Sequence, residues 1–284
     1  MCDETLFKPQ ETGLSRRHFA AAGSAAVFAA YGAEALAKGP ALVEHMVSVP
    51  TPDGTCDAFF VHPARGKHPA VILWPDIGGL REAKFAIARR LAAKGFAVLA
   101  VNHYYRGSRL PILGNFNEWR TPAGQEKLKP LIAGVNAQTN MRDARAFVAW
   151  LDGQKAVDRK RGIGSQGYCM TGSWAVRTAA AVPDRVKAAA SFHGGGMVGD
   201  RPESPNRVLG QTRAGFLVAI ARNDDAKAPD DKTAFKAAAQ AAGRPAEVEV
   251  YAADHGWCVP DSPSYNAAEA DRAFARLLAL YRSL

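Results

Sequence analysis

The chain has 284 residues, 48% of them hydrophobic and 22% charged, which is the ordinary composition of a globular protein. Its net charge of +9 is spread along the sequence without a run of Lys and Arg interleaved with aromatic residues, so nucleic-acid binding is not indicated. After the first 37 residues, no apolar stretch is long enough and free enough of charge to span a membrane, which argues against stable membrane insertion of that part.

The first 37 residues have the order of parts that is typical of a secretory signal. Arg16 and Arg17, with Phe19 two positions on, precede an alanine-rich apolar run, and Ala35-Leu36-Ala37 supplies the small residues of a cleavage site. Paired arginines followed by phenylalanine resemble the twin-arginine export signal. We therefore expect residues 1–37 to engage the twin-arginine export machinery, with cleavage after Ala37 and residues 38–284 in the periplasm or outside the cell. A cytosolic amphipathic helix that happens to contain two arginines is the alternative.

The first half of the remaining chain alternates between strand-like apolar runs and helical periodicity. Residues 43–49 and 56–62 predict a β-hairpin with Asp53-Gly54 as its turn. The following segments predict, in order, a buried strand over 70–74, a helix over 83–94 that ends at Gly95, a buried strand over 96–101, a long loop over 103–134 and a helix over 140–152. A loop of that length is typical of a segment that lines a pocket.

The second half continues the alternation. It predicts a short strand before Cys169, a helix over 170–181, strands over 187–192, 216–221 and 246–251, and an amphipathic helix over 267–284. Repeated strand–helix alternation implies an α/β fold with a mostly parallel sheet that helices cover on both faces. We expect a single domain over residues 38–284, with ligands bound beyond the carboxyl ends of the strands.

Three cysteines remain once Cys2 leaves with the signal, namely Cys56, Cys169 and Cys258. An oxidising compartment favours one disulfide and one free thiol, and a pair between Cys56 and Cys258 would leave Cys169 free, although spacing alone does not fix the pairing. There is no Cys-x-x-Cys pair or His/Cys cluster, so we expect neither a metal nor another cofactor.

The segment Gly167-Tyr168-Cys169-Met170-Thr171-Gly172 places a cysteine in a glycine-flanked turn between a strand and a helix. This context predicts a nucleophile elbow. Gly167 gives room where the backbone doubles back, and the N-terminus of the following helix stabilises a thiolate. A small buried structural cysteine is the alternative for Cys169.

An acid and a histidine follow the elbow at suitable places. Asp224 and Asp225 come just after the strand over 216–221, and His255 comes after the strand over 246–251. The order Cys169, Asp224, His255 is the chain order of the α/β-hydrolase triad, and the adjacent Asp225 leaves the choice of acid open. In this arrangement His255 activates the thiol and protonates the leaving alkoxide, while the acid orients the imidazole. The Met170 amide, with one from the turn after residues 70–74, would bind the oxyanion.

These residues together resemble the dienelactone hydrolase family over most of residues 43–284. The elbow Gly-Tyr-Cys-Met is close to that family's Gly-Tyr-Cys-(Leu/Met)-Gly-Gly, and Trp74-Pro75-Asp76-Ile77-Gly78-Gly79 falls at the family's oxyanion turn. The resemblance implies that Asp76 contacts the resting Cys169 and helps to switch its thiolate on. It also implies that the Ile77 amide is the second oxyanion donor and that Arg106 binds a substrate carboxylate. A loop-capping role is the alternative for Asp76.

Three departures from the family pattern bear on the substrate. Thr171 replaces the first glycine after the nucleophile pair, and Asp76 replaces a glutamate. Residues 256–260 lack the family's second carboxylate-binding arginine, with Val259 in this stretch, so an apolar or aromatic wall replaces that charge. We expect Tyr105 and Trp257 in this wall, with Trp119 and Tyr104, and His193 on the pocket floor or against the elbow helix.

We therefore expect an exported hydrolase that cleaves a small-molecule ester or lactone, other than dienelactone itself, through an acyl-cysteine intermediate. A non-catalytic or redox-sensing periplasmic binding protein on the same scaffold is the alternative from another class. A thioesterase that uses the same three residues is the alternative among enzymes.

Overall fold

The computed structural model describes residues 39–284, so the predicted export signal lies outside the described residues. The strands are β1 (Leu42–Thr51), β2 (Gly54–Pro63), β3 (Ala70–Trp74), β4 (Ala97–Val101), β5 (Ile163–Tyr168), β6 (Val186–Phe192), β7 (Gly215–Ala221) and β8 (Ala246–Tyr251). The main helices are α2 (Glu82–Ala92), α3 (Phe116–Trp119), α4 (Pro122–Ala133), α5 (Ala137–Asp152), α6 (Gly172–Ala181), α7 (Pro205–Val208), α8 (Arg222–Lys227), α9 (Asp231–Ala241) and α10 (Ala267–Tyr281). Short 3₁₀ turns, η1 (Cys169–Thr171) and η2 (Leu209–Gln211), precede α6 and follow α7. Within these described residues, no helix is both long and apolar enough to cross a membrane.

Eight strands form one sheet in the order β1-β2-β4-β3-β5-β6-β7-β8. The pairs β1–β2 and β2–β4 are antiparallel, and every pair from β4–β3 to β7–β8 is parallel. The central strands β3 and β4 are buried at every residue, as expected for strands with helices on both sides. This arrangement confirms the predicted single-domain α/β fold and makes it the α/β-hydrolase fold.

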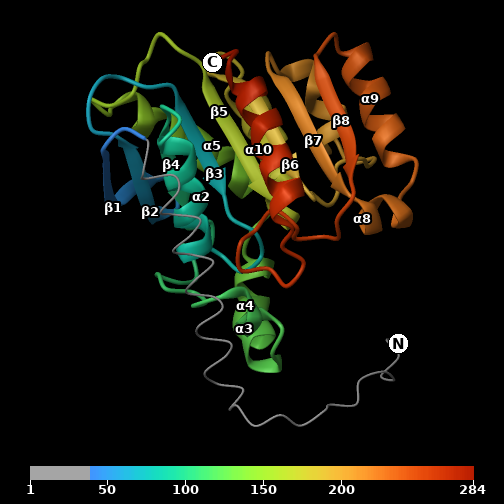
Figure 1. The fold of residues 1–284 in the computed structure, drawn as a ribbon, viewed down its shortest axis with the longest axis horizontal. Coiled ribbons are helices and arrows are strands. Elements are labelled where there is room, and N and C mark those ends of the chain that lie inside the picture. Colours follow the sequence, from blue (N-terminus) through green and yellow to red (C-terminus); the bar gives the residue numbers. More distant parts are fainter. Residues whose placement is uncertain (1–38) are drawn as a thin grey trace.

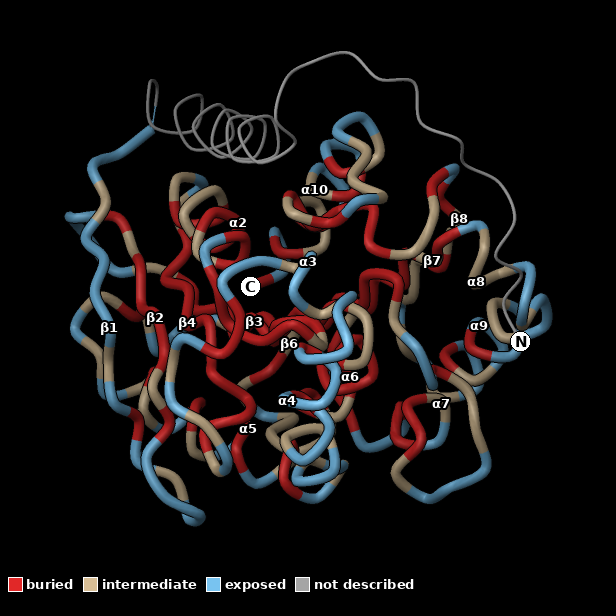
Figure 2. The backbone as a smooth tube through the Cα atoms, turned by 90° about the horizontal axis from the view of Figure 1, so that it is seen from below, coloured by how far each residue is buried: buried red, intermediate tan, exposed pale blue. Residues whose placement is uncertain are grey.

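Helices cover the two faces of the sheet as separate layers (Figures 1 and 2). α2 and α10 pack on one face through a core cluster that includes Leu91 and Leu277. α5, α6 and α9 pack on the other face through a second cluster that includes Phe147, Trp174 and Phe235. α3 and α4 project beyond one end of the sheet, the end at which α8 follows β7 (Figure 1).

The predicted hairpin and the predicted strands are confirmed with boundary shifts of one to a few residues. The segment 103–134 was expected to be a loop, and that expectation is wrong for its second half, which contains α3 and α4. Thr121 begins α4 by accepting a hydrogen bond from the Gly124 amide, and Pro122 occupies its first turn. The helix expected from residue 140 begins three residues earlier, since Asn136 and Thr139 form a capping box.

The two buried cysteines are not paired. Cys56 lies in the core cluster on the α5 face and Cys258 in the cluster on the α10 face, and both are free thiols. A Cys56–Cys258 disulfide is therefore ruled out in this fold, because the sheet separates the two sulfurs. Cys169 is also free and partly exposed.

Candidate active site

The elbow at Cys169 is a strained turn that the surrounding residues hold in place. Cys169 has a φ of 57°, in the left-handed region that a residue with a side chain rarely adopts. A Cβ on Gly167 would lie 2.0 Å from the Thr171 carbonyl oxygen, and one on Gly172 would lie 2.5 Å from the Gly194 Cα. Only glycine fits at these two positions, as the sequence predicted for Gly167.

Thr171 fastens the elbow to the neighbouring strand. Its hydroxyl accepts a hydrogen bond from the Tyr168 amide (2.9 Å) and lies 3.0 Å from the Trp74 carbonyl oxygen, to which it donates. The side chain is completely buried. The turn therefore accommodates threonine where the family has glycine, because the hydroxyl satisfies buried backbone groups there.

The three residues predicted for the triad come from the ends of three parallel strands. Cys169 follows β5, Asp224 lies in α8 just after β7, and His255 follows β8. Asp224 Oδ2 lies 2.6 Å from His255 Nδ1, whereas Asp225 pairs with Lys232 at 2.7 Å. Of the two candidate acids, Asp224 is therefore the one that contacts His255.

The Cys169 side chain lies close enough to the His255 ring to affect its pKa. Burial opposes protonation of this ring, but the Asp224 carboxylate and the neighbouring Cys169 prevail and raise the pKa of His255 to about 10. An imidazole with such a pKa holds its proton at neutral pH, which favours an imidazolium beside the thiol. That pairing is what a cysteine nucleophile needs.

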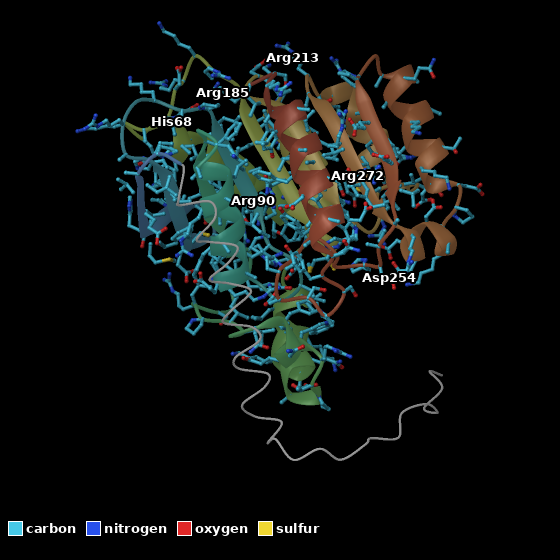
Figure 3. All side chains as sticks on the ribbon, viewed as in Figure 1. His68, Arg90, Arg185, Arg213, Asp254 and Arg272 are labelled. Atoms are coloured by element: carbon cyan, nitrogen blue, oxygen red, sulfur yellow. The ribbon has the colours of Figure 1, made fainter. Side chains whose placement is uncertain are left out.

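Two residues missed in the sequence hold the histidine loop against α8. The Asn223 side chain accepts a hydrogen bond from the His255 amide at 2.8 Å. Arg222 donates to Asp254 at 2.8 Å, and Asp254 lies beside α8 at the same end of the sheet (Figure 3). Since Arg222 and Asn223 directly precede Asp224, one helical turn positions both the acid and the base. The run Arg-Asn-Asp-Asp was the available signal, because its polar residues follow a buried strand.

Tyr104 links the two residues predicted to supply the oxyanion amides. Its hydroxyl donates to the Ile77 carbonyl oxygen at 3.1 Å and contacts Met170 Sδ at 3.4 Å. Ile77 is partly exposed between the buried Asp76 and Gly78. Tyr104 itself is buried, so it acts as a brace behind this turn and not as an exposed pocket wall.

Asp76 lies in a buried ion-pair network. Its carboxylate is 2.6 Å from Arg81 Nη1 and 2.7 Å from Lys84 Nζ, and it accepts a hydrogen bond from the Gly78 amide. Burial favours the neutral acid, but the two cations prevail and hold the pKa of Asp76 well below its usual range. The expected contact with Cys169 is not among these interactions. The carboxylate instead braces the turn that carries Ile77, because Arg81 and Lys84 take up its oxygens.

Arg81 extends this network to two other loops. It donates from Nε to Asp261 Oδ2 at 2.7 Å, and Asp261 also accepts a hydrogen bond from the Phe116 amide at 2.9 Å. Asp261 lies six residues after His255, and Phe116 begins α3. One buried guanidinium thus connects the turn of Ile77, the loop after His255 and the projecting helices. Sequence reasoning missed Arg81, Lys84 and Asp261, because Asp261 is 180 positions from Arg81 and no local pattern indicates that Arg81 and Lys84 turn inward.

Arg106 and Tyr105, which were expected to bind substrate, contact other side chains of the protein. Arg106 pairs with Asp53 at 2.6 Å and with Asp143 at 2.7 Å. The Tyr105 hydroxyl donates to Asp143 and lies 2.7 Å from the Thr51 hydroxyl. These contacts tie the β1–β2 turn to α5, so the expected substrate-binding role of Arg106 and Tyr105 has no support in their contacts.

The aromatic wall expected beyond His255 is part of the core. Trp257 is completely buried and stacks on Tyr251 with ring centroids 4.6 Å apart, and Val259 is also buried. His193 lies closer to the chemistry, with its ring centroid 4.5 Å from that of His255. Burial and the neighbouring His255 keep the pKa of His193 well below the ordinary value, so a neutral His193 ring packs against His255.

Within residues 39–284, no group of three or more His, Cys, Asp or Glu side chains has an arrangement that could hold a metal ion.

The sheet order, the elbow after β5 and the placement of acid and histidine after β7 and β8 define an α/β hydrolase. The model of the dienelactone hydrolase family matches residues 56–284, and the chain belongs to that family. It is thus a dienelactone hydrolase-like ester hydrolase.

Curated relatives carry the provisional name carboxymethylenebutenolidase. One from Methylorubrum extorquens is 29% identical over 247 residues, which cover 85% of this chain and 81% of the relative. One from Synechocystis is 26% identical and covers 84% of this chain and 96% of the relative.

Solved structures agree in fold. A provisionally named dienelactone hydrolase from Klebsiella pneumoniae matches with a TM-score of 0.73 and 23% identity, over 86% of this chain and all of its own (100%). A dienelactone hydrolase-like promiscuous phosphotriesterase from metagenomic libraries matches with a TM-score of 0.69 and 20% identity, over 86% and 99% of the two chains.

Proposed function

We propose that the protein hydrolyses carboxylic esters or lactones through an acyl-enzyme formed on Cys169. The observation that carries this proposal is the His255 ring, whose Nδ1 lies 2.6 Å from Asp224 Oδ2 and which has Cys169 of the elbow as its neighbour. Acylation begins when the Cys169 sulfur attacks the ester carbonyl carbon and the C–S bond forms. The C–O bond then breaks, and the His255 imidazolium gives its proton to the leaving alkoxide.

Deacylation reverses the roles of the same groups. Neutral His255 takes a proton from water, and the resulting hydroxide attacks the thioester carbonyl to form a C–O bond. The C–S bond then breaks, which releases the carboxylic acid and returns Cys169 as a thiolate beside the His255 imidazolium. Both tetrahedral intermediates carry a negative oxygen, which the amides of Met170 and Ile77 would stabilise. Tyr104 supports this role because it braces both residues.

The direct test is the pre-steady-state hydrolysis of p-nitrophenyl acetate by the wild type and by Cys169→Ala. The wild type should release one equivalent of p-nitrophenol per enzyme in a burst before the slower steady rate. Cys169→Ala should lose the burst and at least about 10³-fold in turnover, in line with the loss of other catalytic nucleophiles. Cys56→Ala is the matched control, because that thiol is buried in β2, which the sheet order separates from β5, β7 and β8, and the variant should leave the burst intact. A Cys169→Ala protein with most of its esterase activity would refute the assignment.

A thioesterase reaction on the same residues requires no different geometry, and only a comparison of oxygen esters with thioesters separates the two. A redox-sensing role would require Cys169 to oxidise in place of turning over. Mass spectrometry of freshly purified protein would then show oxidised Cys169 and no burst.

We also propose that residues 1–37 direct export through the twin-arginine route, because Arg16, Arg17 and the small residues before Lys38 occur in the required order. Cell fractionation tests this proposal. The wild-type chain should be found outside the cytoplasm and shortened by 37 residues, whereas the double substitution Arg16→Lys and Arg17→Lys should leave it full length in the cytoplasm.

A further inference from the structure

A pocket of about 200 Å³ opens beside the triad, on the face of the sheet that carries α9. His255, Asp224 and the triglycine loop 194–196 form one side of it. The loop lies directly against the elbow, because the Gly195 amide donates to the Cys169 carbonyl oxygen at 3.3 Å. A group in this pocket would therefore touch the base of the triad.

The far wall of the pocket is apolar. It is formed by Met197, Val218, Ile220, Ala228, Phe235 and Val248. An apolar cavity of about 150 Å³ is large enough to bind benzene. The pocket beside His255 therefore has room for one ring, or for a branched group of similar size.

Most of the charges around the pocket are paired with a neighbour. Lys227 and Lys232 contribute two cations, and Asp224 and Asp231 contribute two carboxylates. Lys232 is also paired with Asp225, and Asp224 with His255. Arg106, to which the family pattern assigns a substrate carboxylate, is paired with Asp53 and Asp143. The described residues thus provide no buried, unpaired cation for an anionic substrate at this pocket.

We propose that this pocket binds the alcohol part of the ester, and that the preferred alcohol is a neutral one with a single ring-sized apolar group. The proposal rests on the proposed function, because it assigns the leaving group of that reaction. His255 lines the pocket and Cys169 does not, so the pocket lies on the side where the leaving oxygen takes its proton. The acyl group, bound to sulfur, lies on the other side.

The assignment makes a kinetic distinction possible. Benzyl acetate and ethyl acetate produce the same acetyl-Cys169, so their deacylation is identical and only acylation can differ. We expect kcat/KM to favour benzyl acetate by about 10-fold or more, since several buried carbon atoms separate the two alcohols. A carboxylate on the ring, as in 4-carboxybenzyl acetate, should remove most of that advantage.

Ile220→Trp tests the pocket itself, because Ile220 is partly exposed at the end of β7 and lines the apolar wall. The larger ring should fill the pocket and bring the benzyl-to-ethyl ratio close to one, chiefly by lowering kcat/KM for benzyl acetate. Leu278→Trp is the matched control: Leu278 is also partly exposed, but packs against the core on the opposite face. If Ile220→Trp fails to fold, Gly195→Val replaces it, because a Cβ on Gly195 meets no atom within 4 Å.

Binding of benzyl alcohol to Cys169→Ala protein gives a readout that needs no turnover. Calorimetry should show binding that the added Ile220→Trp substitution abolishes and the added Leu278→Trp substitution retains. Three results would overturn the proposal. They are a wild type that does not prefer benzyl acetate, a wild type that prefers 4-carboxybenzyl acetate, and an Ile220→Trp variant that loses kcat/KM equally with benzyl and ethyl acetate. Loss of ester hydrolysis altogether, with benzyl alcohol still bound at this pocket, would count against the proposed function and not against the pocket.

Discussion

Replacing Asp76 by asparagine distinguishes two roles for this residue. As the thiolate switch expected from the family pattern, Asp76 would affect activity and contribute little to stability. As the centre of the ion network seen in the structure, it would contribute mainly to stability. Asp76→Asn keeps the shape of the side chain and removes its charge, so the two roles give opposite results.

The expected loss follows from the burial of the network. The Asp76 side chain is 3% exposed and that of Lys84 is 0% exposed. Asparagine at position 76 leaves Arg81 paired with Asp261, and it leaves Lys84 without an ion-pair partner among the described residues. Removing one partner from a buried ion pair costs about 3–5 kcal/mol. A loss of that size is a large part of the total stability of a domain, which is about 5–15 kcal/mol.

Urea unfolding at pH 7, followed by near-ultraviolet circular dichroism, measures this loss. Asp271→Asn is the matched control, because Asp271 pairs with Arg90 at 2.7 Å but is 65% exposed, and such surface pairs contribute about 0–1 kcal/mol. Because the folded pKa of Asp76 lies below the unfolded value, its contribution is present above about pH 4 and decreases as the pH falls. An Asp76→Asn protein as stable as Asp271→Asn, but altered in its burst of thiol acylation, would refute the structural role and restore the switch.

Three further predictions concern the elbow, the base and the cysteines. Asp224→Asn should reduce kcat/KM by about 10³–10⁴-fold, as in other triads whose acid is made neutral. Its alkaline limb should move down from near pH 10, since the raised pKa of His255 depends on this carboxylate; an unmoved limb would contradict the assigned cause. Thr171→Val should lower the free energy of unfolding by about 1–3 kcal/mol, because it leaves the Tyr168 amide buried without its partner. Thr171→Ser should recover most of that loss, and equal stability of the Val and Ser variants would be the contrary result. With Cys2→Ser, native protein should react with one equivalent of a thiol reagent, since burial raises the pKa of both Cys56 and Cys258; unfolded protein should react with three.

The fold could be predicted from the sequence because its signals are local. Each buried strand is a short apolar run bounded by polar or glycine residues, and the helices between them show regular periodicity. α4 was missed because Pro122, Gly124 and Pro130 indicate a loop, and α3 was missed because it has only four residues. Each begins at a side-chain cap, Asn115 for α3 and Thr121 for α4. The order of elbow, acid and histidine could also be predicted, because it follows the chain order of the strands.

The residues around the triad could not be predicted, since their roles depend on partners far apart in the sequence. Arg81 and Asp261 are 180 positions apart, and Arg106 and Asp53 are 53 apart. Nothing in the sequence near Arg106 indicates that two aspartates neutralise it. The role of Asp76 was also mistaken, because the family pattern places its carboxylate near Cys169, whereas in the structure the carboxylate pairs with Lys84.

The most direct test of the account is the mass of the protein during turnover. The enzyme is mixed with p-nitrophenyl acetate, quenched in acid within the burst, digested and examined by peptide mass spectrometry. We expect an added acetyl group on the peptide that contains Cys169 in the wild type, and none on the corresponding peptide of Cys169→Ala. Turnover with an unmodified Cys169 peptide at every quench time, or an acetyl group on another residue, would contradict it.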